Sequence, residues 1–273
     1  MAGWAPWLGR AATVVFVTKE EPVIAPQSAD RTSALNAGGT TRDALVRALG
    51  SSLVAAYLHG SAVLGGYRPD RSDLDILALT ERPMADQELD AVAANVIDGE
   101  YPAKGLEMTL MTREEARQPD LRAPRFQMHI TTGGPNGVTR VVDGRNREGD
   151  RDLVLHLAVC RRRGLTLIGP PPEETLASVP TARIRSAMLD EIEWATVSGQ
   201  PEYLVLTSAR AWLFAETGRI ASKIEAGEWA ARRYPEPAVI GSALIRQRGG
   251  TIAIDKPAAD HFARLAKRAL LRP

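Results

Sequence analysis

The chain contains a single cysteine among its 273 residues, which excludes an internal disulfide. Cys160 lies in an apolar stretch, so we expect it in the core of a protein from a reducing compartment, the cytoplasm. A strong charge of one sign is also missing, because 34 Lys and Arg residues nearly balance 33 Asp and Glu residues. Proteins that bind a nucleic-acid backbone normally carry a positive excess, so polymeric nucleic acid is not an expected partner.

The N-terminal region lacks the features of a membrane anchor or a signal peptide. Its longest apolar run, residues 11–18, is too short to span a bilayer, and it has neither a basic leader nor a small-residue cleavage site. No membrane partner is expected. Residues 19–41 are rich in Pro, Ser, Thr, Ala and Gly. We therefore expect residues 1–38 to form a poorly ordered extension.

The spacing of apolar residues divides the remaining chain into two predicted domains. In residues 39–150 we expect strands at 53–58, 73–79, 106–111, 125–131 and 138–142 and helices at 43–49 and 85–97. The turn-rich residues 132–150 mark the boundary. In residues 151–273 the period is helical, with helices expected at 153–162, 183–197, 202–217, 223–233, 239–247 and 258–271. The predicted fold class is α+β, a mixed sheet with flanking helices followed by an all-α helical bundle.

Two acidic residues open the second predicted strand. Asp73 and Asp75 lie one residue apart, so their side chains share one face of the strand. Like charges this close raise each other's pKa unless a cation lies between them. Hard oxygen ligands of this kind suit Mg²⁺. The pair therefore predicts a magnesium site, although an Asp-x-Asp motif by itself is a weak signal.

A glycine and a serine follow the first predicted strand. Gly60 has no side chain, so the backbone can approach a phosphate closely there. The hydroxyl and the amide of Ser61 can bind phosphate oxygens. The two motifs together are more specific than either one, because they place a phosphate site and a metal site at the ends of two successive strands.

This combination resembles the signature of the polymerase-β-type nucleotidyltransferases. The residues that carry it follow an apolar strand and are Gly60, Ser61, Gly65, Gly66, Ser72, Asp73 and Asp75. Within that superfamily the chain is most similar to the streptomycin/spectinomycin (aminoglycoside) adenylyltransferases, over residues 52–235. The resemblance implies a nucleotidyltransferase sheet domain, ATP as co-substrate, and nucleotide binding by Gly60, Ser61 and Ser72. One departure is that eleven residues separate Ser61 from Asp73, where that family usually has ten.

Glu107 is the candidate for a third carboxylate. It lies on the strand face opposite Leu106 and Met108, so it reaches the Asp73 and Asp75 edge if the two strands are neighbours. From the pattern alone a solvated glutamate is the commoner outcome. The resemblance matches this segment to the one that holds the family's general base. It therefore implies that Asp73, Asp75 and Glu107 are catalytic and bind Mg²⁺, and that Glu107 takes the proton from the acceptor hydroxyl.

The helical half contains two cations in positions that need an explanation. Residues 222–225 have the form of a capping box, which puts Lys223 at the positive end of a helix dipole. A cation there is unfavourable unless an anion binds beside it. Arg210 lies in a largely apolar helix, where a guanidinium needs a carboxylate or a phosphate. The resemblance implies that Lys223 contacts the ATP triphosphate and that Asp152 contacts the nucleotide. A surface lysine and an ordinary first-turn aspartate are the alternatives.

His129, Trp194 and Glu202 are candidate contacts for the hydroxyl acceptor. The resemblance matches Trp194 to a tryptophan near the drug site, whereas the helical pattern alone favours a core position. His129 stands where streptomycin-modifying members have a tryptophan that stacks on the drug, so streptomycin is not the favoured substrate. A cationic aminocyclitol also needs carboxylates, and the candidates are Asp190, Glu191, Glu193 and Glu202. From the pattern alone, a solvated helix face is the favoured explanation of these acidic residues.

These features predict a monomeric, cytoplasmic enzyme that transfers AMP from ATP to a hydroxyl of an aminoglycoside or aminocyclitol such as spectinomycin. Pyrophosphate is the second product, and Mg²⁺ is the cofactor. One alternative is an adenylyltransferase that acts on a protein or another small metabolite. The other is a nucleotide-binding regulator without catalysis, which the full set of carboxylates disfavours. His59 and His156 are expected to be packed or singly hydrogen-bonded rather than catalytic.

Overall fold

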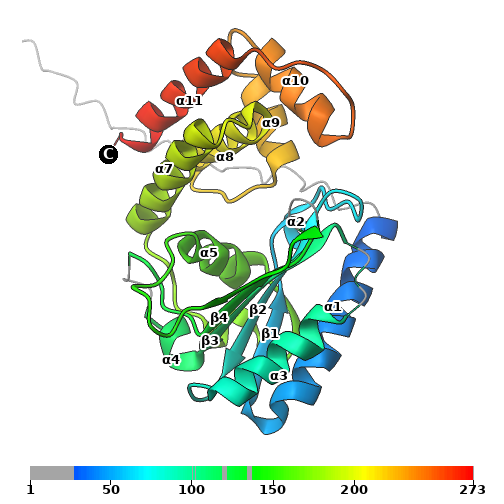
Figure 1. The fold of residues 1–273 in the computed structure, drawn as a ribbon. Helices are drawn as coiled ribbons and strands as arrows, with labels where there is room; N and C mark the ends of the chain where they lie inside the picture. The colour runs from blue at the N-terminus through cyan, green and yellow to red at the C-terminus, as the bar shows by residue number, and fades with distance from the viewer. Residues whose placement is uncertain (1–27, 100, 102, 119–121, 134–136, 273) are drawn as a thin grey trace, which may run out of the picture.

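A computed structural model describes residues 28–99, 101, 103–118, 122–133 and 137–272 (Figure 1). A sheet with covering helices forms one half of the molecule, and a group of helices forms the other. The predicted α+β class is therefore confirmed. Within the described residues, no helix is both long and apolar enough to cross a membrane.

Among the described residues, the sheet has six strands in the order β5-β4-β3-β2-β1-β6. Only β2 and β3 run parallel, and the other neighbours are antiparallel. The strands are β1 (Leu53–Leu58), β2 (Asp73–Thr80), β3 (Gly105–Thr112), β4 (Met128–Thr131), β5 (Arg140–Asp143) and β6 (Leu165–Ile168). The parallel pair at the centre brings the start of β2 beside the start of β3.

The alternation of side chains along β2 assigns each face of the sheet to a different core. Leu74 and Ile76 pack in a cluster with α1 (Ser28–Leu49) and α3 (Asp86–Ile97). Leu77 and Leu79 pack in the second cluster, which continues through α5 (Leu153–Arg163) into the helical half. Successive strand residues point to opposite faces. Asp73 and Asp75 therefore lie on the face that looks toward the helical half.

The helical half packs around α8, which runs through its centre. Its helices are α7 (Thr181–Ser198), α8 (Pro201–Thr217), α9 (Lys223–Ala231), α10 (Ala238–Gln247) and α11 (Lys256–Leu270). Buried Leu206 and Phe214 of α8 belong to the same core as Phe262 of α11. Short helical turns complete the molecule: η1 (Gly50–Ser52), α2 (Ser61–Leu64), α4 (Arg113–Ala116) and α6 (Pro172–Thr175).

Helix α1 corrects the expectation for the N-terminal extension. It begins at Ser28, so residues 28–38 are helical, whereas we expected a helix only from residue 43; residues 1–27 lie outside the described part. The segment contains Gly38 and Gly39, which have low helix propensity. Packing overrides that propensity, because Ala34 and Ala37 are fully buried and a Cβ on Gly38 would come within 3.0 Å of a Leu167 methyl group.

Strand β6 corrects the expectation that all residues after 150 are helical. It pairs with β1 at the sheet edge and follows α5 after Gly164 alone. The sheet half therefore extends beyond residue 150, and the group of bundle helices begins with α7 at Thr181. β6 has only four residues, and it follows the arginine-rich end of α5 directly. Its apolar pattern is therefore too short to predict a strand.

Candidate active site

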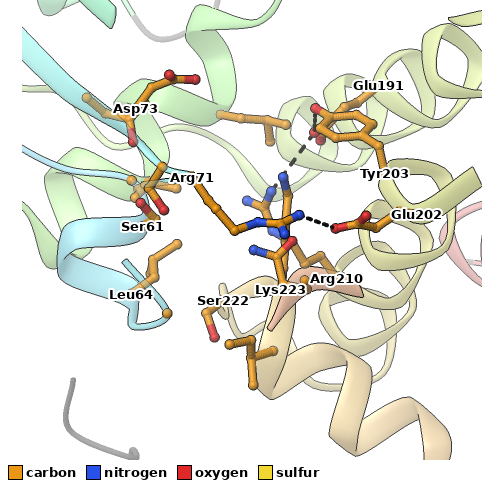
Figure 2. A pocket seen from close by; sticks show the side chains of 18 of the residues that line it. Ser61, Leu64, Arg71, Asp73, Glu191, Glu202, Tyr203, Arg210, Ser222 and Lys223 are labelled. Atoms are coloured by element: carbon orange, nitrogen blue, oxygen red, sulfur yellow. Dashed lines mark hydrogen bonds and ion pairs between the residues drawn. The ribbon is translucent and has the colours of Figure 1, made fainter. Parts of the chain in front are cut away.

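A cavity of about 780 Å³ lies between the sheet half and the helical half. One wall comes from the starts of β2 and β3 and from the loop between β1 and β2. The other wall comes from α7, α8 and α9 and from the end of α10. Figure 2 shows side chains of both walls pointing into the space between them.

Three carboxylates gather on the sheet wall. Asp73 and Asp75 open β2, and the parallel register sets Asp75 directly opposite Glu107 on β3. All three line the cavity. Burial and the neighbouring charges of Glu107 and Asp73 raise the pKa of Asp75 to about 7. Burial also raises the pKa of Asp73, against the opposing effect of Lys104, whose Nζ lies 3.7 Å from Asp73 Oδ1.

Gly60 is required by the position of Asp75. Its backbone has φ +60°, and a Cβ there would lie 1.7 Å from Asp75 Oδ2. Any side chain at this position would displace the carboxylate. The backbone N–H of Ser61 hydrogen-bonds Asp75 and lowers its pKa. The Ser61 amide thus contacts Asp75, and Ser61 lines the cavity; its expected role in phosphate binding stays a prediction.

The loop before β2 is folded into a tight turn around Arg68. The amides of Arg71 and Ser72 donate to the Arg68 carbonyl oxygen at 3.0 and 2.7 Å, and the Arg68 amide donates to Ser72 Oγ at 3.0 Å. This turn accommodates the eleven residues between Ser61 and Asp73. It also fixes Ser72 beside the cavity, with its hydroxyl hydrogen available to a ligand.

The helical wall contributes two cationic side chains, Arg210 and Lys223, whose charges are only partly balanced by neighbouring carboxylates. Arg210 lies 3.9 Å from Glu191, and its buried Nε has no hydrogen-bond partner. Lys223 Nζ lies 4.5 Å from the centre of the Tyr203 ring. Burial and the charge of Arg210 lower the pKa of Lys223. An anion in the cavity would compensate both groups.

Local structure puts Lys223 at the cavity. Ser222 caps α9 by accepting a hydrogen bond from the Glu225 amide at 3.1 Å. The expected reciprocal half of the capping box is absent at this helix, because the Glu225 carboxylate pairs with Arg219. Lys223 is thus the first residue of α9, where the helix dipole disfavours a cation and favours a bound anion.

Histidines flank Glu107. Its Oε1 lies 3.7 Å from Nε2 of His156 and 3.8 Å from Nε2 of His129. Burial acts to lower the pKa of His156, but Glu107, Asp75 and Asp152 outweigh it and raise that pKa. His156 lines the cavity beside Glu107, and the expectation that it is packed or singly hydrogen-bonded rather than catalytic stays a prediction. Its signal in the sequence was its place four residues after Asp152, on the same helix face.

Other predicted site residues divide into two groups. Asp152 lines the cavity at the start of α5, where burial and Asp150 raise its pKa. His129 is held by a 2.9 Å hydrogen bond between Thr109 Oγ1 and its Nδ1, and it is not among the described residues that line the cavity. His59 is buried and packs against His156, as expected, and burial holds its pKa well below the usual value.

Two of the candidate contacts for the acceptor, Trp194 and Glu202, line the cavity. Trp194 is 59% exposed at the cavity, so its expected core position is wrong, and its ring meets Tyr203 edge to face. Glu202 lines the cavity but pairs with Arg246 at 3.1 Å and Arg71 at 3.7 Å.

Of the other three acidic residues on α7 that were candidates for the acceptor site, one lines the cavity and two do not. Glu191 lines the cavity and accepts a hydrogen bond of 2.7 Å from the Tyr203 hydroxyl. Asp190 pairs with Arg151 and Glu193 with Lys267, both away from the cavity. Asp190 and Glu193 therefore fit the alternative of a solvated helix face rather than a place in the acceptor cleft.

The carboxylates of the sheet wall fit a metal ion that binds together with a phosphorylated ligand. No group of three or more His, Cys, Asp or Glu side chains among the described residues is placed to hold a metal ion by itself. Mg²⁺, however, is usually bound by one or two carboxylates together with substrate phosphates. The oxygen donors of Asp73 and Asp75 suit it, and the raised pKa of Asp75 reflects negative charge that a cation would relieve.

Comparisons with known proteins agree with this site. Residues 41–130 match the profile of the nucleotidyltransferase domain, and residues 174–268 match that of the aminoglycoside adenylyltransferase C-terminal domain. The chain is therefore a nucleotidyltransferase. A spectinomycin 9-adenylyltransferase of Staphylococcus aureus is 31% identical over 200 residues, which cover 68% of this chain and 74% of the relative. The chain belongs to the aminoglycoside adenylyltransferase family.

Two further comparisons agree in sequence and in fold. An aminoglycoside (3'') (9) adenylyltransferase of Klebsiella pneumoniae is 29% identical over 211 residues, 69% of this chain and 75% of that protein. The crystal structure of spectinomycin adenyltransferase AAD(9) from Enterococcus faecialis, with ATP and spectinomycin, superposes with a TM-score of 0.67. The superposition covers 88% of this chain and 99% of the Enterococcus chain, with 21% sequence identity, and it supports the fold assignment.

Proposed function

We propose that this nucleotidyltransferase transfers AMP from ATP to a hydroxyl of an aminocyclitol or aminoglycoside antibiotic, with spectinomycin as the favoured acceptor. One observation carries the proposal: the carboxylates of β2 and β3 face Lys223 and Arg210 across a single cavity. The names of the relatives and the ligands of the Enterococcus structure support ATP and spectinomycin as the substrates. We further propose a cytoplasmic monomer that acts on small molecules.

The proposed reaction is an in-line displacement at the α-phosphorus of ATP. The acceptor oxygen forms a bond to that phosphorus while the bond to the bridging oxygen of the β-phosphate breaks, and pyrophosphate leaves. Glu107 receives the hydroxyl proton. Its position opposite Asp75 supports this role, and His156 and His129 limit the space in which its carboxylate can turn.

In the proposal, Asp73, Asp75 and Glu107 hold Mg²⁺, which stabilises the charge on the reacting phosphate oxygens when it is bound. The hydroxyls of Ser61 and Ser72 bind phosphate oxygens at the sheet wall, next to Gly60. The remaining proposed nucleotide ligands are Lys223 and Arg210 on the helical wall and Asp152 at the start of α5.

Trp194 and Glu191 are the proposed contacts for the acceptor on the helical wall. An exposed tryptophan edge to face with Tyr203 offers a flat apolar surface for a fused ring system. Glu191 offers a carboxylate to a ligand ammonium group. Glu202 and His129 remain proposed as secondary contacts, Glu202 because it lines the cavity and His129 because it borders Glu107.

Pyrophosphate release from MgATP tests the proposal. We expect turnover with spectinomycin in a panel that also contains streptomycin and other aminoglycosides, with Asp75→Asn as the background control. Intact-mass measurement of the acceptor should show the addition of one AMP. No turnover with any antibiotic, together with AMP transfer to a protein, would favour the other enzyme hypothesis. Nucleotide binding without any turnover would favour a regulator.

Lys223→Ala is expected to weaken MgATP binding while the fold stays intact. A charge-assisted hydrogen bond contributes about 1.5–3 kcal/mol, so the dissociation constant should rise roughly tenfold or more. Lys256→Ala is the matched control, because Lys256 is also the first residue of a helix but pairs with Asp260 at the surface. Titration calorimetry measures both affinities. An unchanged affinity in Lys223→Ala would remove Lys223 from the proposed site.

A further inference from the structure

Arg71 reaches across the cavity from the sheet half. It follows the turn around Arg68, whose carbonyl oxygen binds the amides of Arg71 and Ser72, so the start of its side chain is fixed. Its guanidinium Nη2 lies 3.7 Å from Glu202 Oε1 on α8, and Figure 2 shows the side chain extended toward that residue. The sheet wall, which carries the three carboxylates, thus also contributes a cation to the cavity.

The contact between Arg71 and Glu202 is replaceable. At 3.7 Å it is longer than a charge-assisted hydrogen bond, and the Arg71 side chain is 36% exposed. Glu202 has a closer partner in Arg246, whose Nε lies 3.1 Å from Oε2. If Arg71 turned to another anion, Glu202 would keep that partner. Arg71 shares the cavity with Ser61 and Lys223, the proposed phosphate ligands of the two walls.

We propose that Arg71 is a ligand of the ATP triphosphate and of the departing pyrophosphate, and that it exchanges Glu202 for phosphate oxygens when the nucleotide enters. This inference rests on the proposed function. A guanidinium binds phosphate through two parallel N–H donors, which a carboxylate contact at 3.7 Å does not satisfy. The exchange leaves neither Arg71 nor Glu202 without a countercharge.

The rival explanation is a latch, in which the ion pair of Arg71 and Glu202 only ties the two halves together. The two explanations predict opposite changes in nucleotide affinity for one of the two substitutions relative to the other. If Arg71 binds phosphate, Glu202 competes for it, so Arg71→Ala weakens nucleotide binding and Glu202→Gln strengthens it. If the pair is a latch, both substitutions break the same contact and change nucleotide affinity in the same direction.

Calorimetric titration of the full chain with MgATP and with magnesium pyrophosphate, without an acceptor, measures this difference. We expect Arg71→Ala to weaken both affinities about tenfold and Arg71→Lys about threefold, because the lysine keeps the charge but loses the paired donors. Glu202→Gln should strengthen both about threefold. Arg68→Ala is the matched control: Arg68 belongs to the same turn but pairs with Asp70 and the Arg248 carbonyl.

The control should stay within about twofold of the parent chain, and thermal unfolding of each variant checks that it folds. The inference is overturned if Arg71→Ala binds both ligands as tightly as the parent, or if Glu202→Gln weakens binding as Arg71→Ala does. An equal loss in Arg68→Ala would also overturn it, because the turn as a whole would then be responsible. Absence of MgATP binding in the parent chain would instead reject the proposed function itself.

Discussion

Asp75→Asn is expected to abolish AMP transfer without destabilising the protein. Asp75 is half-buried beside Glu107 and Asp73, where its negative charge is unfavourable unless a cation binds. Asparagine has nearly the same shape and still offers an oxygen to the Ser61 amide. It lacks the charge that attracts Mg²⁺, which supplies several kcal/mol of stabilisation to the reacting phosphate. A rate loss of roughly 10³-fold or more follows.

Two measurements check this prediction together. Pyrophosphate release should fall to background, and calorimetry should show loss of magnesium-dependent ATP binding, while the melting temperature stays at or above that of the parent. Asp90→Asn, at an exposed position on α3, is the matched control and should behave as the parent. An active Asp75→Asn protein would contradict the proposed mechanism. A strongly lowered melting temperature would show that the carboxylate stabilises the fold.

Glu107→Gln is expected to separate binding from chemistry. The amide keeps the size of the side chain but cannot accept the acceptor proton, so kcat should fall about 10²- to 10⁴-fold. The variant should still bind MgATP, because Asp73 and Asp75 remain to hold the metal ion and the amide keeps an oxygen toward it. Single-turnover pyrophosphate release and titration calorimetry measure the two quantities. Glu114→Gln, exposed on α4, is the matched control.

The two substitutions distinguish the roles of neighbouring carboxylates. Retention of full kcat in Glu107→Gln would assign the base to another group at the cavity, and His156 is the nearest candidate at 3.7 Å. Loss of MgATP binding in Glu107→Gln would show that Glu107 acts mainly through the metal ion. Either result would leave the proposal of AMP transfer intact and change only its catalytic base.

The central strands could be predicted because their signals are local. β1 occupies the expected residues 53–58, and β2 begins at Asp73 as expected. Apolar runs bounded by glycine and by an acidic pair specify the residues, the strand faces and the start of the second strand. The same local signals identified the family, which the comparisons confirm.

Contacts between distant segments were not predictable in this way. Helix α1 begins 15 residues before the expected helix because its buried alanines pack closely on the sheet, although its glycines disfavour a helix. Trp194 has the pattern of a core residue, yet it is exposed because α7 ends beside the cavity. His156 reaches Glu107 only because α5 covers that face of the sheet.

The sequence by itself determined the fold class, the family, and the carboxylates and cations from which a site can be built, because residue type and short spacing decide these features. Tertiary structure alone decided which of them meet. It placed Asp75 opposite Glu107 through the parallel register, and it brought Arg71 to Glu202 across the cavity. Such contacts join residues more than 30 and 130 positions apart. No local pattern encodes them, since the first depends on the pairing of two strands and the second on how the helical half packs against the sheet half.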